Sequence, residues 1–200
     1  MKKIGVLAMQ GAFVEHISAL HRLGAEAVPL RLSAEFKGIS ALIIPGGEST
    51  TIGKLMKDYS LVEELRKLIA KGLPVMGTCA GMILLAKQVR GPKQHTLEVM
   101  DIEVRRNAFG RQVDSFETPL NIPVLGQPPF PAVFIRAPRI ENVGDGVEVL
   151  SSLPDGSAVA VRQGNLLATA FHPELTDDLR FHGYFLSIVN GSPKANTDDA

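Results

Sequence analysis

The only cysteine of the chain, Cys79, lies between two glycines in the segment VMGTCAGMILLA, residues 75–86. The pattern predicts a strand, a sharp turn and a helix around a G-x-C-x-G core, the cysteine form of a nucleophile elbow. Glycines on both sides let strand and helix approach closely. The turn would place the sulfur at a helix N-terminus, where the dipole favours the thiolate. Cys79 is therefore a candidate nucleophile, although a free cysteine is also often a buried structural residue.

A histidine and a carboxylate follow late in the chain, in the segment TAFHPEL, residues 169–175. Because Pro173 pushes the residue before it towards an extended conformation, His172 and Glu174 should point to the same side. Glu174 could then fix the tautomer of His172, whose other nitrogen would exchange a proton with Cys79. A surface turn is the alternative for this segment taken alone. Together with the elbow, it predicts a Cys-His-Glu triad.

A third segment, LIIPGGEST at residues 42–50, predicts a strand that ends in Pro-Gly-Gly before a helix begins near Ser49. Its glycines can turn backbone N–H groups inward, so Gly47 is a candidate oxyanion donor beside the N–H of Ala80. An ordinary strand-to-helix turn would look similar. Its position favours a site, because open α/β sheets bind ligands at the carboxyl ends of their strands.

The elements that must position these residues alternate between short apolar runs and helix-period segments. This alternation predicts a parallel sheet covered on both faces. The expected strands are 3–8, 26–31, 41–47 and 74–77, and the expected helices are 13–24, 49–57, 61–72 and 80–88.

The second half of the chain contains more strand-like runs and turn signals, so the sheet should gain antiparallel strands late. The expected strands are 96–106, 132–137, 147–153, 157–163 and 166–173, with a surface loop at 121–131 and a closing helix at 177–189. The sequence predicts a single α/β domain over residues 1–190, with an open, mostly parallel mixed sheet. Residues 191–200 are expected to be a disordered tail.

The charge balance, the cysteine count and the apolar runs exclude several classes of protein. The 21 basic and 21 acidic residues give a net charge of zero, which argues against a nucleic-acid or anionic-membrane surface. One cysteine cannot form an internal disulfide, so we expect a reducing compartment, the cytoplasm. The first residues lack the features of a signal peptide, and no apolar run approaches the ~20 residues of a membrane helix.

The remaining histidines carry no catalytic prediction. His16 and His21 fall on the first helix without an acid nearby and are expected to be exposed or to face a partner. His95 is expected to be solvated and His182 to pack. The arginines around residue 105 are interpreted as a charged strand end, since no aromatic platform for nucleic acid accompanies them.

The three segments together resemble the class I, or triad, glutamine amidotransferase family, over nearly the whole chain. Within it, the chain is similar to the small stand-alone glutaminase subunits of pyridoxal 5′-phosphate synthase. The resemblance rests on residues 5–16, 45–50, 77–86, 105–117, 134–138 and 171–175.

This resemblance implies hydrolysis of L-glutamine to L-glutamate and ammonia through a thioester, without a metal or cofactor of the glutaminase domain itself. The ammonia would pass through a tunnel to a synthase subunit in a large hetero-oligomer. Cys79 would be the nucleophile, His172 the base and acid, and Glu174 the orienting carboxylate. By the same resemblance, Gln10 would lie near the partner, and the substrate would contact Gly47, Glu48, Ser49, Arg106, Ile135 and Arg136.

Three alternatives remain open on the sequence. The chain could serve another synthase, of the imidazole-glycerol phosphate or anthranilate type. It could be a DJ-1/PfpI-like cysteine hydrolase, although the histidine that closely follows the elbow in that superfamily is missing after Cys79. It could also be a regulatory subunit that kept the fold and lost the activity.

Overall fold

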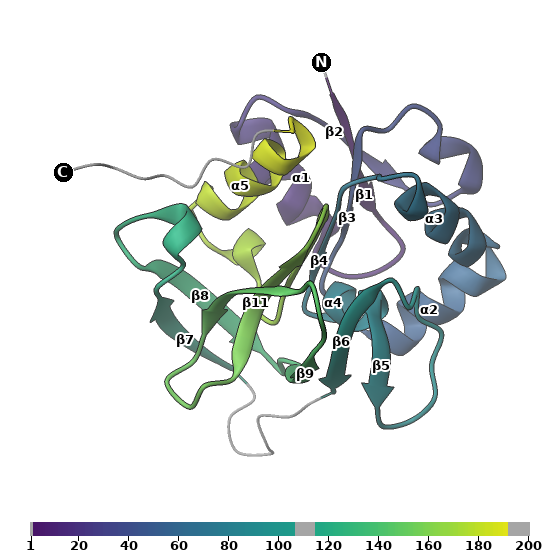
Figure 1. Cartoon of the computed structure of the whole chain (residues 1–200). Coiled ribbons are helices and arrows are strands. Elements are labelled where there is room, and N and C mark those ends of the chain that lie inside the picture. The colour runs from purple at the N-terminus through teal and green to yellow at the C-terminus, as the bar shows by residue number, and fades with distance from the viewer. Residues whose placement is uncertain (1, 107–114, 192–200) are drawn as a thin grey trace.

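A seven-stranded sheet forms the centre of the computed structural model, which describes residues 2–106 and 115–191. Its strand order is β10-β11-β12-β4-β3-β1-β2 (Figure 1). The parallel strands are β1 (Lys3–Leu7), β2 (Glu26–Leu30), β3 (Ala41–Ile44), β4 (Val75–Thr78) and β12 (Leu166–Thr169). The antiparallel strands are β11 (Ala158–Gln163) and β10 (Glu148–Ser152). The prediction of a mostly parallel sheet that gains antiparallel strands late is confirmed.

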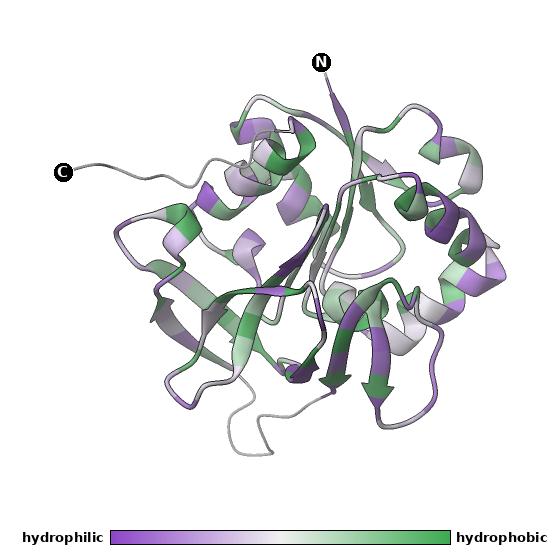
Figure 2. Ribbon diagram, viewed as in Figure 1, coloured by the Kyte–Doolittle hydropathy of each residue, from purple (hydrophilic) through white to green (hydrophobic). Residues whose placement is uncertain are grey.

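Helices cover both faces of this sheet, as predicted. Helices α1 (Phe13–Arg22) and α5 (Arg180–Val189) lie on one face (Figure 1). Helices α2 (Ser49–Asp58), α3 (Leu61–Ala70) and α4 (Ala80–Leu85) lie on the other. Because both faces are covered, β3, β4 and β12 are buried along their whole length and are mostly apolar (Figure 2). The outer helices are apolar on one side only, towards the sheet.

Two smaller sheets flank the central one, and this the sequence did not predict. The first contains β5 (Ala86–Arg90), β6 (Met100–Arg105) and β9 (Arg139–Val143). The second pairs β7 (Ser115–Leu120) with β8 (Phe130–Ile135). The strand-like runs at 96–106 and 132–137 therefore belong to separate sheets and not to the central one. Short 3-10 helices occupy Ser33–Phe36 (η1), Pro123–Leu125 (η2) and Pro173–Leu175 (η3).

Several predicted boundaries are wrong. The helix expected over 80–88 ends at Leu85, because the chain continues directly as β5 and pairs with β6. The closing helix starts at Arg180 rather than at 177, and the strand expected to reach 173 ends at Thr169. The surface loop expected at 121–131 contains η2 and the start of β8. Of the tail expected to be disordered, residues 192–200 lie outside the described residues.

None of the helices in residues 2–106 and 115–191 is long and apolar enough to cross a membrane.

The strand register brings the three predicted segments to one edge of the sheet. Ile44 of β3 is paired with Gly77 of β4, and Thr78 is paired with Thr169 of β12. The Pro-Gly-Gly turn, Cys79 and the His172 segment therefore leave adjacent strands at the same end. This is the edge at which open α/β sheets bind ligands.

Both glycines of the elbow are required by close packing. A Cβ atom on Gly77 would lie 2.6 Å from the backbone carbon of Gly81, and a Cβ atom on Gly81 would lie 2.0 Å from the backbone oxygen of Ile44. Backbone atoms cannot move aside as a flexible side chain can. Residues without a side chain at 77 and 81 therefore let α4 pack directly on β3 and β4.

We expect Gly81→Ala to lower the free energy of unfolding by about 1–3 kcal/mol or more, because the added methyl overlaps a central-strand carbonyl. Urea unfolding followed by circular dichroism measures this change. Gly183→Ala in α5 is the matched control, since a Cβ atom there meets nothing within 4 Å. The control should gain up to about 1 kcal/mol from better helix propensity. Equal stability of the two variants would contradict the packing argument.

Candidate active site

Cys79 occupies a strained backbone position between β4 and α4. Its φ of 50° and ψ of −101° lie in a region that L-residues rarely adopt. The backbone is held there because the Cys79 N–H donates to the Thr169 carbonyl at 2.8 Å. Its Sγ lies 3.9 Å from the Ile135 carbonyl oxygen, and the side chain is almost buried. Such strain is typical of a side chain held for function.

His172 and Glu174 form a short buried contact beside Cys79. The Nδ1 atom of His172 lies 2.7 Å from Oε1 of Glu174. The sequence predicted an extended segment here, and this prediction is wrong. Pro173 starts the 3-10 turn η3, which folds Glu174 back onto the imidazole. The backbone N–H of His172 donates to the Val133 carbonyl at 2.8 Å, so β8 also fixes the position of this segment. With Nδ1 paired to Glu174, Nε2 of His172 is left for Cys79.

The protonation of this pair follows from its partners. Burial alone lowers the pKa of His172, but the hydrogen bonds with Cys79 and Glu174 outweigh it and raise the pKa to about 10. Burial raises the pKa of Glu174, yet the neighbouring His16 and His172 prevail, and the pKa falls below its ordinary value. Glu174 is therefore an ionised carboxylate next to a protonated imidazole at neutral pH. An imidazolium beside a sulfur is the arrangement that stabilises a thiolate.

A cavity of about 370 Å³ opens above Cys79. The structure brings together around it all the residues that the sequence proposed for the site, except Glu174, which lies behind His172. The lining residues are Gln10, Gly47, Glu48, Ser49, Cys79, Ala80, Ile83, Arg106, Ile135, Arg136 and His172. Ile83 is the one member that the sequence did not propose. Its position one turn after Cys79 on α4 could have suggested it.

The Pro-Gly-Gly turn that follows β3, residues 45–47 and here called the glycine loop, lies against the 10–12 segment that follows β1. The Ala12 N–H donates to the Gly46 carbonyl at 3.1 Å, and the Glu48 N–H donates to Oε1 of Gln10 at 2.7 Å. Gly11 has a φ of 98°, and a Cβ atom there would lie 1.8 Å from the Gly46 oxygen. A Cβ atom on Gly46 would lie 2.3 Å from Cε1 of His172. The loop is thus confined between the 10–12 segment and the imidazole.

Arg106 joins a polar network at the rim of the cavity. Its guanidinium donates to Thr50 Oγ1 at 2.8 Å, to Glu48 Oε1 at 2.9 Å and to Gln94 Oε1 at 3.1 Å. The Ser49 hydroxyl also donates to Gln94, at 3.0 Å. Sequence reasoning missed Gln94, since a lone glutamine in a loop carries no signal of periodicity or spacing.

Glu48 also caps helix α2. Its carboxylate accepts from the backbone N–H groups of Thr50 and Thr51, at 3.1 and 2.7 Å. Burial alone raises the pKa of Glu48, but these hydrogen bonds and that of the Thr51 hydroxyl outweigh it and lower the pKa to about 2. Glu48 therefore presents a negative charge next to the positive charge of Arg106.

The prediction for His16 is wrong. Its side chain is fully buried, and its Nε2 lies 3.4 Å from Oε2 of Glu174 and 3.2 Å from Oγ1 of Thr78. Its Nδ1 lies 2.9 Å from Nε2 of His182, which packs in the core as predicted. Helical spacing could have revealed this, because His16 is four residues before the buried Leu20. Of the other two, His95 is exposed as expected, and His21 is exposed too.

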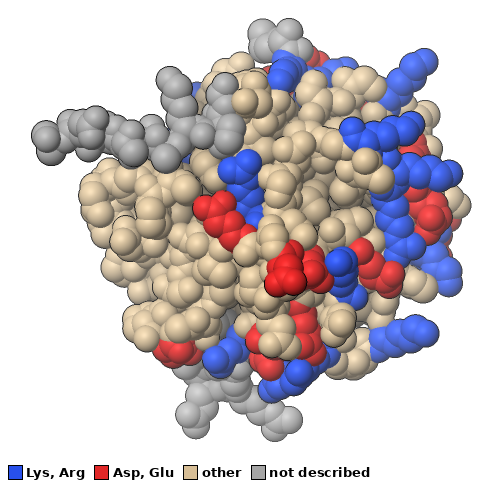
Figure 3. All heavy atoms as spheres, in the orientation of Figure 1, with Lys and Arg blue, Asp and Glu red and all other residues tan. Residues whose placement is uncertain are grey.

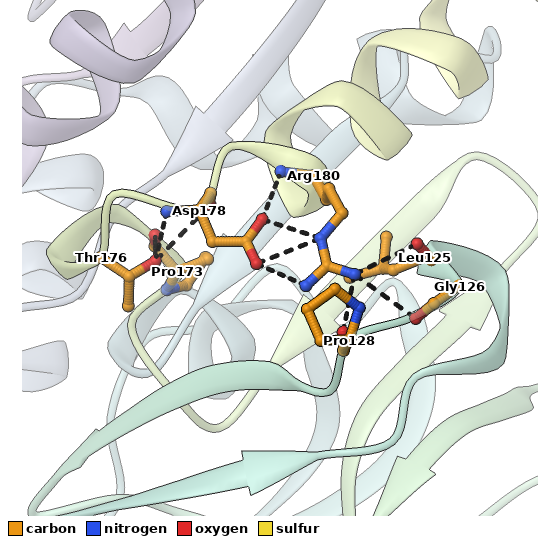
Figure 4. Close-up of polar contacts among 7 residues, drawn as sticks. All are labelled: Leu125, Gly126, Pro128, Pro173, Thr176, Asp178 and Arg180. Atoms are coloured by element: carbon orange, nitrogen blue, oxygen red, sulfur yellow. Dashed lines mark hydrogen bonds and ion pairs between the residues drawn. The ribbon is translucent and has the colours of Figure 1, made fainter.

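A side-chain clasp fixes the chain after Glu174 (Figure 4). The Arg180 guanidinium is ion-paired with Asp178 at 2.5 Å and donates to the carbonyls of Leu125, Gly126 and Pro128. The Thr176 hydroxyl donates to the Pro173 carbonyl at 3.3 Å. The turn that carries the histidine and the carboxylate is thereby tied to the η2 loop.

The surface shows no large area of one charge on the face drawn in Figure 3, where acidic and basic side chains lie near one another. This agrees with the zero net charge of the sequence. Within the described ranges, no group of three or more histidine, cysteine, aspartate or glutamate residues is arranged to hold a metal ion.

Comparison with known proteins gives consistent matches. Residues 6–190 match the model of the "SNO glutamine amidotransferase family". A pyridoxal 5′-phosphate synthase subunit PdxT of Moorella thermoacetica is 60% identical over 94% of this chain and 99% of its own length. A protein of the same name from Herpetosiphon aurantiacus is 59% identical over 92% of this chain and 99% of its length.

Solved structures agree. The crystal structure of a glutamine amidotransferase superposes with a TM-score of 0.88 at 53% identity, covering 94% of this chain and 98% of the other. A putative GMP synthase component from Thermoplasma acidophilum shares the fold alone, with a TM-score of 0.65 at 21% identity over 96% of this chain and 95% of the other.

Removal of the thiol should lower the pKa of His172. In Cys79→Ala only Glu174 still opposes the effect of burial, so the pKa should fall from about 10 towards its ordinary value. NMR titration of ¹⁵N-labelled histidine measures this directly. In the wild type the pKa of His172 is raised on folding, so its contribution to stability is complete below about pH 6.5 and is lost as the pH rises through about 10. An unchanged His172 titration in Cys79→Ala would show that the sulfur does not interact with the imidazole.

Proposed function

Since the chain belongs to the SNO glutamine amidotransferase family, we propose that it is the glutaminase subunit of a pyridoxal 5′-phosphate synthase. It is a glutamine amidotransferase, an enzyme that releases ammonia from L-glutamine. The observation that carries the proposal is the placement of Cys79 and His172 in a cavity with a charged rim, with Glu174 bound to the imidazole from behind. The PdxT relatives, at about 60% identity over nearly their full length, support the choice of synthase.

The chemistry begins with the sulfur. The Cys79 thiolate attacks the side-chain amide carbon of glutamine, and the carbonyl oxygen becomes an oxyanion. The imidazolium of His172 gives its proton to the departing nitrogen, so ammonia leaves and a thioester with Cys79 remains. Water then loses a proton to His172 and attacks the thioester. The sulfur leaves as the thiolate, the new carboxylic acid loses its proton to solvent as glutamate, and the thiolate–imidazolium pair is restored. Glu174 stays ionised throughout and holds the imidazole in the correct orientation.

The oxyanion is assigned to two backbone donors, the N–H groups of Ala80 and Gly47. Ala80 directly follows the nucleophile at the start of α4, and Gly47 lines the same cavity. A backbone donor of this kind contributes on the order of 10²–10³ in rate. The orientation of the Gly46–Gly47 peptide therefore decides much of the activity.

The charged rim is assigned to the amino-acid end of glutamine. Free glutamine carries one carboxylate and one ammonium group, and the rim offers an ion pair of opposite charges, the guanidinium of Arg106 and the carboxylate of Glu48, 2.9 Å apart. Ser49, Ile135 and Arg136 complete the wall of the cavity and are assigned to substrate contact. A guanidinium such as that of Arg106 can make two parallel hydrogen bonds to the carboxylate of glutamine, which a lysine ammonium cannot.

Gln10 is assigned to the interface with the synthase partner. Its side-chain oxygen accepts from the Glu48 N–H, so the 10–12 segment is coupled directly to the glycine loop. A partner that binds this segment would reorient the Gly46–Gly47 peptide and so control hydrolysis. The ammonia would be passed to the synthase rather than released.

The glutaminase domain is assigned to residues 1–190. We place the reaction in the cytoplasm, where a catalytic thiol stays reduced. Other synthases remain the second candidate, because the fold itself is shared with the GMP synthase component from Thermoplasma. The cysteine-hydrolase alternative lacks support, since Ala80 follows the nucleophile and the histidine comes from the distant η3 turn.

Glutamate release from glutamine, measured with and without the synthase partner of pyridoxal 5′-phosphate synthase, tests the proposal. We expect the partner to raise turnover and Cys79→Ala to abolish it, because no other group can form the thioester. If turnover requires Cys79 but is the same with and without this partner, the proposed hydrolysis mechanism stands and the chain serves another synthase. No hydrolysis in its presence would contradict the assignment as a glutaminase.

Arg106→Lys should raise KM by on the order of tenfold with a smaller change in kcat, because a lysine cannot make the paired contacts of a guanidinium. Steady-state kinetics at several glutamine concentrations measure the two constants. Arg105→Lys is the matched control, since Arg105 faces Glu141, away from the cavity lining. Equal KM values for the two variants would remove Arg106 from the substrate site.

A further inference from the structure

Behind the triad lies a second pair of histidines that the mechanism does not use. His16 on α1 and His182 on α5 are both fully buried, and their ring nitrogens lie 2.9 Å apart. The two helices cover the same face of the central sheet (Figure 1). A buried pair of titratable rings that made no specific contact would be costly compared with apolar residues of the same size.

The histidine pair faces Oε2 of Glu174, the carboxylate oxygen on the core side. Oε1 is bound to His172, whereas Oε2 is buried and has no hydrogen-bond partner among the described residues. Its one ion-pairing neighbour there is Nε2 of His16, at 3.4 Å, a distance of electrostatic contact rather than of a well-formed hydrogen bond. A half-satisfied carboxylate in the interior depends on that single neighbour.

The tautomer of His16 follows from the chemistry of its neighbours. An ionised carboxylate only accepts, so Nε2 of His16 must carry the proton if the contact with Glu174 is to be attractive. The same N–H lies 3.2 Å from Oγ1 of Thr78, which accepts it as a hydrogen bond, and Oε2 of Glu174 faces it at 3.4 Å. Nδ1 is then an acceptor, and Nε2 of His182 must donate to it. Nδ1 of His182 is left as a lone pair, which agrees with its having no hydrogen-bond partner among the described residues.

Both rings are neutral in this arrangement. Burial lowers the pKa of His16, against the opposing charge of Glu174, and burial together with His16 lowers the pKa of His182 to about 3. The charged and titratable groups that face His16 are Glu174, His172, Glu15 and His182. A neutral donor can orient the carboxylate without competing with His172 for its charge.

We propose that His16 is a positioning residue for Glu174, and that His182 fixes the tautomer in which His16 presents its Nε2–H to the inner carboxylate oxygen. The order of contacts is His182 to His16, His16 to Glu174, Glu174 to His172, and His172 to Cys79. The buried histidine pair thus extends the triad from the sheet edge into the core. The effect of this extension on turnover rests on the proposed glutamine hydrolysis.

The variants His16→Gln and His16→Asn test this extension as a matched pair. A glutamine amide reaches the position of Nε2, whereas an asparagine amide stops at the position of Nδ1 and removes the N–H group that faces Oε2 of Glu174 and Oγ1 of Thr78. His16→Asn should therefore favour protonation of Glu174 and make the thiolate–imidazolium pair less populated. Near pH 6 we expect kcat to fall on the order of tenfold and the loss to shrink as the pH rises, with KM little changed. His16→Gln should stay within about threefold of the wild type.

Alkylation of Cys79 by iodoacetamide in the free protein gives a readout that needs neither glutamine nor a partner. Its rate should show the same acid-side loss in His16→Asn and not in His16→Gln. His21→Asn, an exposed histidine of the same helix, should behave as the wild type. Equal effects of the two His16 variants at every pH, or no effect of either, would overturn the proposal. If the wild type reacts with iodoacetamide but does not hydrolyse glutamine with its partner, the proposed function fails, and the alkylation profiles still decide the role of His16.

One measurement on the wild type remains decisive even if both His16 variants fail to fold. Long-range ¹H–¹⁵N correlation spectra distinguish the two neutral tautomers of histidine and the cation. We expect His16 to be neutral and protonated on Nε2 between about pH 6 and pH 8. A cationic His16, or one protonated on Nδ1, would overturn the proposal.

Discussion

The interaction on which the site depends is the contact of the buried Glu174 carboxylate with the His172 imidazole. A negative charge in the interior is stable only when nearby polar or charged groups compensate it, and here an imidazole faces each of the two carboxylate oxygens. The 3-10 turn at Pro173 folds the carboxylate back onto the His172 imidazole, and His16 of α1 faces the other oxygen from the core side. The sheet, the turn and the first helix must all be in place before the sulfur has a partner.

Strain and close packing at the elbow complete this arrangement. Cys79 adopts its unusual backbone angles because β12 accepts its N–H and because the glycines on either side leave no gap between α4 and the sheet. The Arg180 clasp then fixes the turn of His172 and Glu174 to the η2 loop on the other side. The nucleophile and its base are thus held by separate parts of the chain, each tied to a rigid element.

Local pattern was enough to predict the parts of the fold that depend on short-range physics. Short apolar runs that alternate with helix-period segments predicted the central strands, and the glycines around Cys79 predicted the elbow. The separate sheets β5-β6-β9 and β7-β8 could not be predicted, because pairing between distant strands decides them; Ala86 leaves a helix and enters a strand without any break in the sequence. At the site, His172 and Glu174 were predicted to meet through an extended segment, and they meet through a turn instead. His16 was missed because its acid partner is 158 positions away in the sequence and reaches it only through η3.

The contact between Gly11 and Gly46 has a consequence for how this chain can evolve. With a Cβ atom at residue 11 only 1.8 Å from the Gly46 oxygen, any side chain introduced there displaces a peptide on the wall of the catalytic cavity, although residue 11 itself does not line that cavity. Residue 11 therefore cannot accept a side chain, although it lies in a surface loop, where substitutions are ordinarily tolerated. The two loops can vary only as a pair, and lineages that diverge in one must carry a compensating change in the other.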